Sequence, residues 1–275
     1  MSETFLKSCQ HWSKDYSDEM TQFYKLATVD YEHLGNSLDW EEELFKYTSS
    51  REDKRLKILD VACGSGKFPS VIQKTLGKSK KIKRVDYSIL DPSLFALEET
   101  KKNLKAPFFV DEEFNSTIQD FKKGNSCYDV SWAMHALYAI PPQDIIESMR
   151  IFKETFRGVG YIAHAREKSH YIEFQKIFLS GFKKNKSVRY TTSEDIMAAL
   201  DQLGIKYEER ILKYENKAES NDRLIVEAYL QRCIFDDTIT LEDLENNTQT
   251  RDYILQCKDQ NGWSFNQEVS LIRVL

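Results

Sequence analysis

The stretch that decides the fold is ILDVACGSGKF, residues 58–68. It overlaps a short apolar run over residues 56–62, which is typical of a strand buried on both faces of a parallel sheet. Gly64 and Gly66 follow this run, and residues 67–77 then carry apolar side chains at helical spacing. A helix that begins after a glycine turn presents free backbone N–H groups and its positive dipole end to a ligand. The stretch therefore predicts a strand, a ligand-binding loop and a helix in succession.

The same alternation continues along the chain. Further strands are expected at residues 83–90, 108–110, 128–133, 158–165, 206–213 and 265–275, and helices over residues 94–104, 143–156, 170–182, 192–203 and 222–233. This pattern predicts a doubly wound α/β fold with a mainly parallel central sheet. We expect one domain over residues 1–275, with a helical N-terminal lid over 1–50, a cofactor-binding core over 56–165 and a substrate region with closing strands over 166–275. A polar break at residues 49–55 separates the lid from the core.

Composition limits the classes of function. The chain has 275 residues, 41% hydrophobic and 30% charged, and its 39 basic and 44 acidic residues give a net charge of −5. An acidic protein is a poor default partner for nucleic acid or an anionic membrane, so neither is expected. No transmembrane run or secretory apolar segment is present in the sequence, which predicts a soluble, cytoplasmic protein. Five cysteines without a CxxC pair predict reduced thiols and no metal site.

Two kinds of cofactor compete for the glycine loop. A dinucleotide requires G-x-G-x-x-G, and the third glycine is absent because Pro69 occupies its place. Asp60 lies four residues before Gly64, where an acid can hold an ammonium group or order the loop. Asp91 ends the next strand, where a carboxylate can accept hydrogen bonds from both hydroxyls of a ribose. These acids favour S-adenosylmethionine over a dinucleotide.

Two further segments are expected near this cofactor. Residues 114–119 (FNSTIQ) would approach the adenine, with Asn115, Ser116 or Thr117 donating or accepting hydrogen bonds; an ordinary loop is the alternative. Residues 134–138 (MHALY) follow the fourth strand and should reach the mouth of the crevice. The candidate cofactor residues are Asp60, Ala62, Gly64, Ser65, Gly66, Asp91, Pro92, Ser116, Thr117 and Met134.

As a set, residues 58–68, Asp91 and residues 128–138 (YDVSWAMHALY) resemble the class I S-adenosylmethionine-dependent methyltransferases. The resemblance covers roughly residues 56–165. It implies a Rossmann-like methyltransferase fold, S-adenosylmethionine as the methyl donor and S-adenosylhomocysteine as the product. A small-molecule acceptor, and a monomer or weak homodimer, are the expected partner and assembly.

A narrower resemblance extends over nearly the whole chain. Residues 134–138, 190–207 and 263–271 are similar in order and spacing to the histamine N-methyltransferase family, which implies a small amine as acceptor. On the matching positions, it implies that His135, Tyr138, Gln267 and Asp30 contact the acceptor. The family has an amide side chain where this chain has His135, and two tyrosines where this chain has Tyr138 and Ala139. It has an asparagine at the position of Gln267 and a glutamate nearest to Val29 or Asp30. The ribose acid of that family is a glutamate, where this chain has Asp91.

The expected chemistry is an in-line displacement, which needs neither a metal nor a covalent intermediate. Holding the nucleophile about 3 Å from the methyl carbon supplies much of the rate enhancement. An amine must be neutral when it attacks, and His135 is the first candidate to take its proton because an imidazole titrates near 6.5; a pocket residue is the alternative. Tyr138 is the second catalytic candidate, as a pocket wall that can hydrogen-bond the substrate.

The remaining candidates concern the acceptor. Tyr16, Phe23 and Tyr24 are expected to form an aromatic lid over a cationic substrate, although core packing would explain the same spacing. The candidate substrate-binding residues are Tyr16, Phe23, Asp30, His135, Tyr138 and Gln267. His164 and His170 are expected to have structural roles.

Three functions stay open from the sequence. They are N-methylation of a small amine, O- or carboxyl-methylation of a metabolic or natural-product intermediate, and a non-catalytic S-adenosylmethionine-binding module. No N/D-P-P-Y/F tetrapeptide follows the fourth strand, which disfavours methylation of adenine or glutamine. The intact acids and glycines of the loop disfavour the non-catalytic module.

Overall fold

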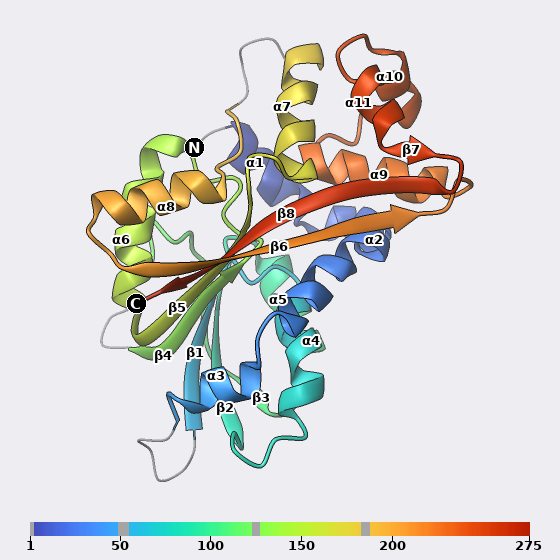
Figure 1. Cartoon of the computed structure of the whole chain (residues 1–275). Coiled ribbons are helices and arrows are strands. Elements are labelled where there is room, and N and C mark those ends of the chain that lie inside the picture. The colour runs from blue at the N-terminus through green and yellow to red at the C-terminus, as the bar shows by residue number, and fades with distance from the viewer. Residues whose placement is uncertain (1–2, 49–54, 123–126, 183–187) are drawn as a thin grey trace.

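The computed structural model describes residues 3–48, 55–122, 127–182 and 188–275 (Figure 1). The expected polar break at residues 49–55 lies outside these ranges except for Arg55. Five parallel strands carry the N-terminal half of the sheet: β1 (Arg55–Val61), β2 (Arg84–Leu90), β3 (Phe108–Phe114), β4 (Tyr128–Met134) and β5 (Phe156–Ala165). The C-terminal half adds β6 (Tyr207–Ala218), β7 (Lys258–Asp259) and β8 (Gly262–Val274).

The strand order distinguishes this sheet from the dinucleotide-binding arrangement. The order is β3-β2-β1-β4-β5-β8-β6, and β7 pairs with β8. A dinucleotide-binding sheet has the order 3-2-1-4-5-6 with parallel strands. Here β8 lies between β5 and β6 and pairs antiparallel with both. The prediction of a mainly parallel sheet is confirmed, and its antiparallel part is confined to this C-terminal edge.

Helices cover both faces of the sheet, and β1 and β4 are therefore buried along nearly their whole length. One face packs against α2 (Ser17–Asn36), α3 (Trp40–Phe45), α4 (Lys67–Leu76) and α5 (Leu94–Asn103). The other packs against α6 (Ile145–Thr155) and α8 (Ser193–Gln202), with the short turn η2 (Pro142–Asp144) preceding α6. The two apolar clusters use alternate residues of the same strands, as Ile58 and Leu59 do on β1.

A ribbon formed by β6 and β8 extends beyond the parallel strands and supports a third apolar cluster (Figure 1). The strands pair from Tyr207 with Val274 to Ala218 with Trp263. In contrast, β5 pairs with β8 only over the first six of these positions, from Gly160 with Val274 to Ala165 with Val269. The helices of this cluster are α2, α7 (His170–Phe182), α9 (Arg223–Ile234), α10 (Leu241–Asn246) and α11 (Arg251–Gln256). The helix α1 (Glu3–His11), which is followed by η1 (Lys14–Tyr16), contacts it through His11, whose ring centre lies 5.7 Å from that of Phe235. The N-terminal helices thus meet the C-terminal helices over one end of the sheet.

Several element boundaries differ from the expectations. The strands expected at 108–110 and 206–213 extend to Phe114 and Ala218, because partner strands continue to pair with polar positions that carry little periodic signal. The helices α10 and α11 were not expected, since six residues are too short to show helical periodicity. The capping box formed by Thr240 and Asp243 is the signal that marks the start of α10.

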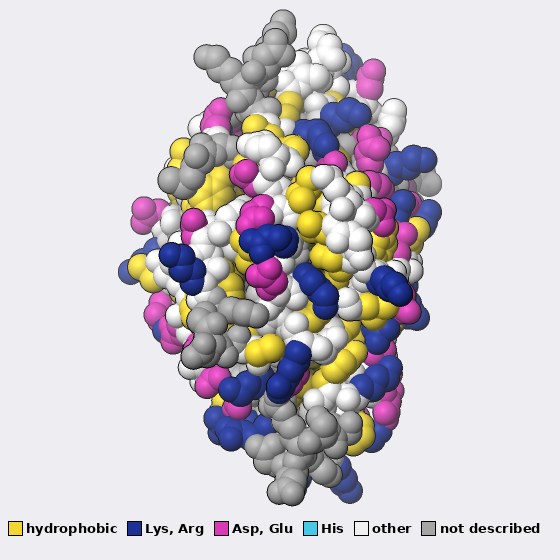
Figure 2. Space-filling view, turned by 90° about the vertical axis from the view of Figure 1, so that its left-hand side faces the viewer, with side chains coloured by type: hydrophobic (Ala, Val, Ile, Leu, Met, Phe, Trp, Pro, Cys, Tyr) yellow, Lys and Arg dark blue, Asp and Glu magenta, His cyan; other side chains and the backbone are white. Residues whose placement is uncertain are grey.

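The face that carries α6 and α8 has mixed charge. Figure 2 shows Lys and Arg side chains interspersed with Asp and Glu on this side of the molecule. On α6, Arg150 pairs with Glu147 and Glu154, and near α8, Arg189 pairs with Asp195 at 2.6 Å. None of the helices in the described ranges is both long enough and apolar enough to cross a bilayer.

Candidate active site

The glycine loop after β1 takes a left-handed backbone at three positions. Ala62, Gly64 and Gly66 have φ values of 53°, 55° and 67°. A Cβ added at Gly64 would meet nothing closer than the Trp12 ring at 4.0 Å, whereas one at Gly66 would lie 3.2 Å from the Cα of Thr100. Gly64 therefore leaves open space in front of the loop, and Gly66 allows α4 and α5 to pack closely.

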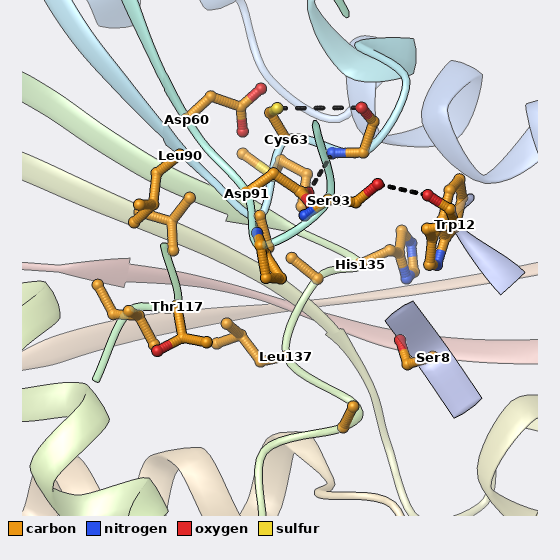
Figure 3. Close-up of a pocket in the computed structure, with 18 of the residues that line it drawn as sticks. Ser8, Trp12, Asp60, Cys63, Leu90, Asp91, Ser93, Thr117, His135 and Leu137 are labelled. Carbon is orange, nitrogen blue, oxygen red and sulfur yellow. Dashed lines mark hydrogen bonds between the residues drawn. The ribbon is translucent and has the colours of Figure 1, made fainter. Parts of the chain in front are cut away.

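Asp91 closes this loop from the end of β2 (Figure 3). Its Oδ2 accepts a hydrogen bond from the Gly64 N–H at 3.0 Å, and its Oδ1 accepts one from the Ser93 N–H at 2.8 Å. Burial raises the pKa of this carboxyl to about 6, against the effect of these two bonds. A carboxylate has about four acceptor positions, so both oxygens can accept a further hydrogen bond from a ligand in the cavity.

Asp60 lies beneath the loop in the same cavity. Its Oδ2 accepts a hydrogen bond from the Tyr87 hydroxyl at 2.5 Å, and the Trp132 indole donates to that hydroxyl at 3.1 Å. Burial raises the pKa of Asp60 to about 7. This chain of hydrogen bonds fixes the carboxyl group at the end of β1, next to the loop it was predicted to order.

The first cavity lies at the carboxyl edge of β1, β2 and β4, and Figure 3 shows Asp60, Asp91, Thr117, Leu137 and His135 around it. Its lining includes eight of the ten predicted cofactor residues: Asp60, Ala62, Gly64, Asp91, Pro92, Ser116, Thr117 and Met134. Apolar walls come from Ile118, Leu137 and Ile140. Asn115 is not among the lining residues, because its amide donates to the carbonyls of Asp91 and Pro92 at 3.1 and 2.9 Å and so holds the loop.

A second cavity adjoins the first. The two share the lining residues Ser8, Trp12, Tyr31, His135, Ala136 and Ala139. The second is otherwise lined by Phe23, Ala27, Asp30, Tyr138, Tyr171, Tyr190, Arg232, Cys233 and Phe235. It is thus an aromatic pocket with few charged side chains, built between α2, α7, α9 and the loop after β4. We call the first the loop cavity and the second the aromatic cavity.

His135 stands at the junction of the two cavities. Its backbone is left-handed, with φ 57°, and its N–H donates to the Ala163 carbonyl at 2.8 Å. The ring Nδ1 is hydrogen-bonded to the Tyr138 hydroxyl at 2.8 Å, and the buried Nε2 has no hydrogen-bond partner among the described residues. Burial, with a smaller contribution from His164, lowers the pKa of His135 to about 3. The imidazole is therefore neutral at physiological pH and is a weak base.

Asp30 is the carboxyl group of the aromatic cavity. It is buried on α2, where Oδ2 accepts a hydrogen bond from the Tyr171 hydroxyl at 2.5 Å and Oδ1 accepts one from the Asn216 amide at 2.9 Å. Burial raises its pKa to about 6, and the hydrogen bonds oppose that shift. Asp30 is thus largely ionised at pH 7 and is a stronger proton acceptor than His135.

Four predicted site residues line neither cavity. Ser65 donates to the Tyr24 hydroxyl at 3.0 Å, and Gly66 contacts Thr100 as described above. Both polar ends of Gln267 have protein partners: Ser169 donates to its Oε1 at 2.6 Å, and its amide donates to Tyr229 at 3.0 Å. Tyr16 accepts a hydrogen bond from Gln10 at 2.7 Å outside the pocket. In the expected aromatic lid, Phe23 lines the aromatic cavity and Tyr24 lines the loop cavity.

Other lining residues had not been anticipated. Trp12, Tyr31, Tyr171, Tyr190 and Arg232 come from five separate helices and loops, so no local motif links them. His164 and His170 take the structural roles expected for them, since each is buried outside the two cavities and hydrogen-bonded through its ring. Their partners are the Thr191 carbonyl and the Tyr253 hydroxyl, both at 2.8 Å. Within the described part of the chain, no three His, Cys, Asp or Glu side chains cluster as metal ligands would.

Comparison with known proteins identifies the fold. No family model matches the sequence, and no curated protein does. Among solved structures, magnesium protoporphyrin IX methyltransferase (ChlM) from Synechocystis PCC 6803 with bound SAH aligns with TM-score 0.55 and 10% identity, covering 96% of each chain. The plantazolicin methyltransferase BpumL in complex with SAH aligns with TM-score 0.51 and 14% identity, covering 98% of this chain and 95% of that one. YcgJ from Bacillus subtilis aligns with TM-score 0.51 and 15% identity, covering 85% and 96%. The predicted Rossmann-like methyltransferase fold is confirmed.

Proposed function

We propose that this chain is an S-adenosylmethionine-dependent methyltransferase that transfers the methyl group to an amine nitrogen of a small molecule. The observation that carries the proposal is the junction of the two cavities at Tyr31, His135 and Ala136. One cavity has the features of a nucleoside cofactor site, and the other is an aromatic pocket with a buried carboxylate. A methyl group bound in the first could reach a nucleophile bound in the second.

The loop cavity fits the chemistry of S-adenosylmethionine. Asp91 retains acceptor capacity for two ribose hydroxyls, and the open space before Gly64 admits the cofactor close to the backbone. Trp12, Tyr24 and Tyr31 supply aromatic faces that attract a cation such as a sulfonium. Two of the similar structures, ChlM and BpumL, contain the demethylated product SAH in the same fold. When bound, the cofactor supplies an electrophilic methyl carbon on a sulfonium that leaves as a thioether.

The aromatic cavity favours an amine as the acceptor. Aromatic faces and an ionised Asp30 both attract a protonated amine. This agrees with the resemblance to the histamine N-methyltransferase family, in which the acceptor is a small amine. Asp30 can take the proton that a bound ammonium must lose before its nitrogen attacks, and can pass it to solvent. The N–C bond would then form as the C–S bond breaks, so that the product leaves as a methylated ammonium and the sulfonium becomes a neutral thioether.

In this proposal the role of His135 changes from the base expected from sequence to a hydrogen-bonding group. A pKa of about 3 makes the imidazole a poor acceptor of the ammonium proton. When Nδ1 carries the proton and donates to Tyr138, the free Nε2 can accept an N–H of the neutral amine. That contact would direct the nitrogen lone pair toward the loop cavity.

A methyl-transfer screen with S-adenosylmethionine and panels of small amines, phenols and carboxylic acids tests the proposal, with products identified by mass spectrometry. We expect methylated amines. Asp30→Asn should lower kcat/KM on the order of 100-fold and remove the rise of kcat/KM through about pH 6, while leaving the affinity for SAH unchanged. The exposed Asp18 on the same helix provides the control, Asp18→Asn. Methylation of phenols or acids in place of amines would overturn the amine assignment, and failure to bind SAH would overturn the proposal as a whole.

A further inference from the structure

Arg232 is a buried guanidinium that lines the aromatic cavity. It lies on α9, and only 4% of its surface is exposed. Its Nη1 donates to the His11 carbonyl, while Nε and Nη2 have no hydrogen-bond partner within the described residues. The Nε–H and the nearer Nη2–H form the fork with which arginine binds a carboxylate through two parallel hydrogen bonds. The free donors of Arg232 are therefore the pair suited to such a ligand.

Arg232 forms no ion pair with any residue that the structure describes. The guanidinium lies 5.0 Å from the centre of the Trp12 ring and 6.0 Å from that of Phe23. Glu19 and Asp237 act on it at longer range, and neither forms an ion pair with it among the described residues. Arg166, by contrast, is more exposed and pairs with three carboxylates, those of Glu194, Glu209 and Glu268. A buried cation is costly unless a partner satisfies it, so the site is incomplete without an anion.

We propose that Arg232 binds a carboxylate carried by the methyl acceptor, so that the acceptor is an amine with an acidic group, as in an amino acid or a short peptide. This inference rests on the proposed function. The nitrogen would lie toward Asp30 and His135, and the carboxylate would accept both free N–H donors of Arg232. The two charged side chains come from different helices, α2 and α9, and line one cavity, so they would select a substrate with both charges.

The cofactor itself carries a carboxylate, which is the other source of the same chemistry. Arg232 lines the aromatic cavity and is absent from the lining of the loop cavity, where Lys67 is the available cation. Lys67 lies at the start of α4, directly after the glycine loop, and its ammonium is 4.2 Å from the centre of the Tyr24 ring. We therefore assign the cofactor carboxylate to the surroundings of Lys67 and the acceptor carboxylate to Arg232.

The test uses amines that differ only in the carboxylate: histidine and histamine, tyrosine and tyramine, tryptophan and tryptamine. Each is titrated by calorimetry into protein saturated with SAH, and each is assayed for methyl transfer. We expect the carboxylate member of at least one pair to bind at least tenfold more tightly than its partner. Arg232→Gln should reduce this preference to within about twofold and leave the affinity for SAH unchanged. Arg223→Gln, which alters an exposed arginine of the same helix paired with Glu245, should keep the preference.

Three results would overturn the inference. The first is equal or weaker binding of the carboxylate member in all pairs. The second is an unchanged preference in Arg232→Gln, and the third is a tenfold loss of SAH affinity in that variant, which would assign the guanidinium to the cofactor. If Arg232→Gln does not fold, Arg232→Lys keeps the charge without the fork and must still weaken the preference. Because binding is measured without turnover, absence of amine methylation would contradict the proposed function and leave this test intact.

Discussion

The two cavities of this protein are built in different ways. The loop cavity is formed by the carboxyl ends of adjacent parallel strands, and its central contacts join the backbone of Gly64 and Ser93 to Asp91. The aromatic cavity is formed by side chains of α2, α7 and α9, which pack on the protruding ribbon of β6 and β8. The strand ends keep their geometry as long as the sheet forms, whereas the helix side chains can be substituted one at a time without altering the sheet. In the proposed function, the first cavity would therefore fix the reaction type, and the second would vary the acceptor on the same fold.

The largest loss of SAH affinity is expected on substitution of Asp91, which tests whether the strand ends define the loop cavity. Asp91→Asn removes the charge and turns an NH2 group toward either the Gly64 or the Ser93 N–H, so the loop loses one of its two anchors. Two hydrogen bonds to a charged group would be weakened, which predicts a loss of SAH affinity of roughly 100-fold or more by calorimetry. Asp111→Asn, an exposed acid on β3, is the control. Affinity within threefold of the wild type would show that the strand edge does not define the cofactor site.

The loop cavity was largely predictable because its determinants follow strands at fixed distances. Asp60, Gly64 and Asp91 could be placed from the sequence, since strand ends bring them to one edge of the sheet. Ser65 and Gly66 do not line the cavity, because spacing identifies the loop without telling which of its residues face the open space. That choice depends on how closely α4 and α5 approach each other, which is a property of the folded chain.

The aromatic cavity was predictable only in part, because its residues come from distant segments. Phe23 and Asp30 line this cavity. Gln267, which like Asp30 was carried over from a resemblance, lies on β8 and is hydrogen-bonded to Ser169 and Tyr229 instead. Strand alternation places Gln267 on the same buried face as Phe265, which argues for the position observed. Arg232 could have been noticed in the sequence, because it is the one charged residue among the buried, mostly apolar positions of α9.

A second prediction concerns the pH dependence of the free energy of unfolding, to which the buried Asp60 of the loop cavity contributes. The pKa of Asp60 is raised from 3.8 to about 7, so the folded chain binds this proton more tightly than the unfolded chain. Its stabilising effect is complete below pH 3.8 and is lost as the pH rises through about 7. Between pH 5 and 8, the wild type should therefore lose about 2 kcal/mol more of its free energy of unfolding than Asp60→Asn does. Urea denaturation at the two pH values measures the difference, and equal losses would contradict it.

A third prediction distinguishes the roles of the two glycines of the loop: Gly66 should affect stability, and Gly64 should affect SAH binding. Gly66→Ala forces a side chain against Thr100 at a φ of 67° and should lower the free energy of unfolding by about 1 to 2 kcal/mol. Gly64→Ala meets only the Trp12 ring, at 4.0 Å, but its methyl group enters the space before the loop. We expect a loss of SAH affinity of about tenfold for Gly64→Ala beyond its own backbone strain. Thermal or urea unfolding and calorimetry on both variants test the assignment, which a reversed pattern would refute.

The smallest effect is expected at Tyr138, in the part of the aromatic cavity nearest the loop cavity. Tyr138→Phe keeps the ring, which packs 4.1 Å from the centre of the His164 ring, and removes the hydroxyl bonded to Nδ1 of His135. Without that partner the tautomer of the imidazole is no longer fixed, so a neutral amine is directed less often, and kcat should fall about three- to tenfold. The affinity for SAH should not change, because Tyr138 does not line the loop cavity. Tyr207→Phe, at the start of β6, is the control, since its hydroxyl is hydrogen-bonded to Asp201 and lines neither cavity. If kcat stays within twofold of the wild type, His135 contributes shape alone, and the polar chemistry of the aromatic cavity reduces to Asp30 and Arg232.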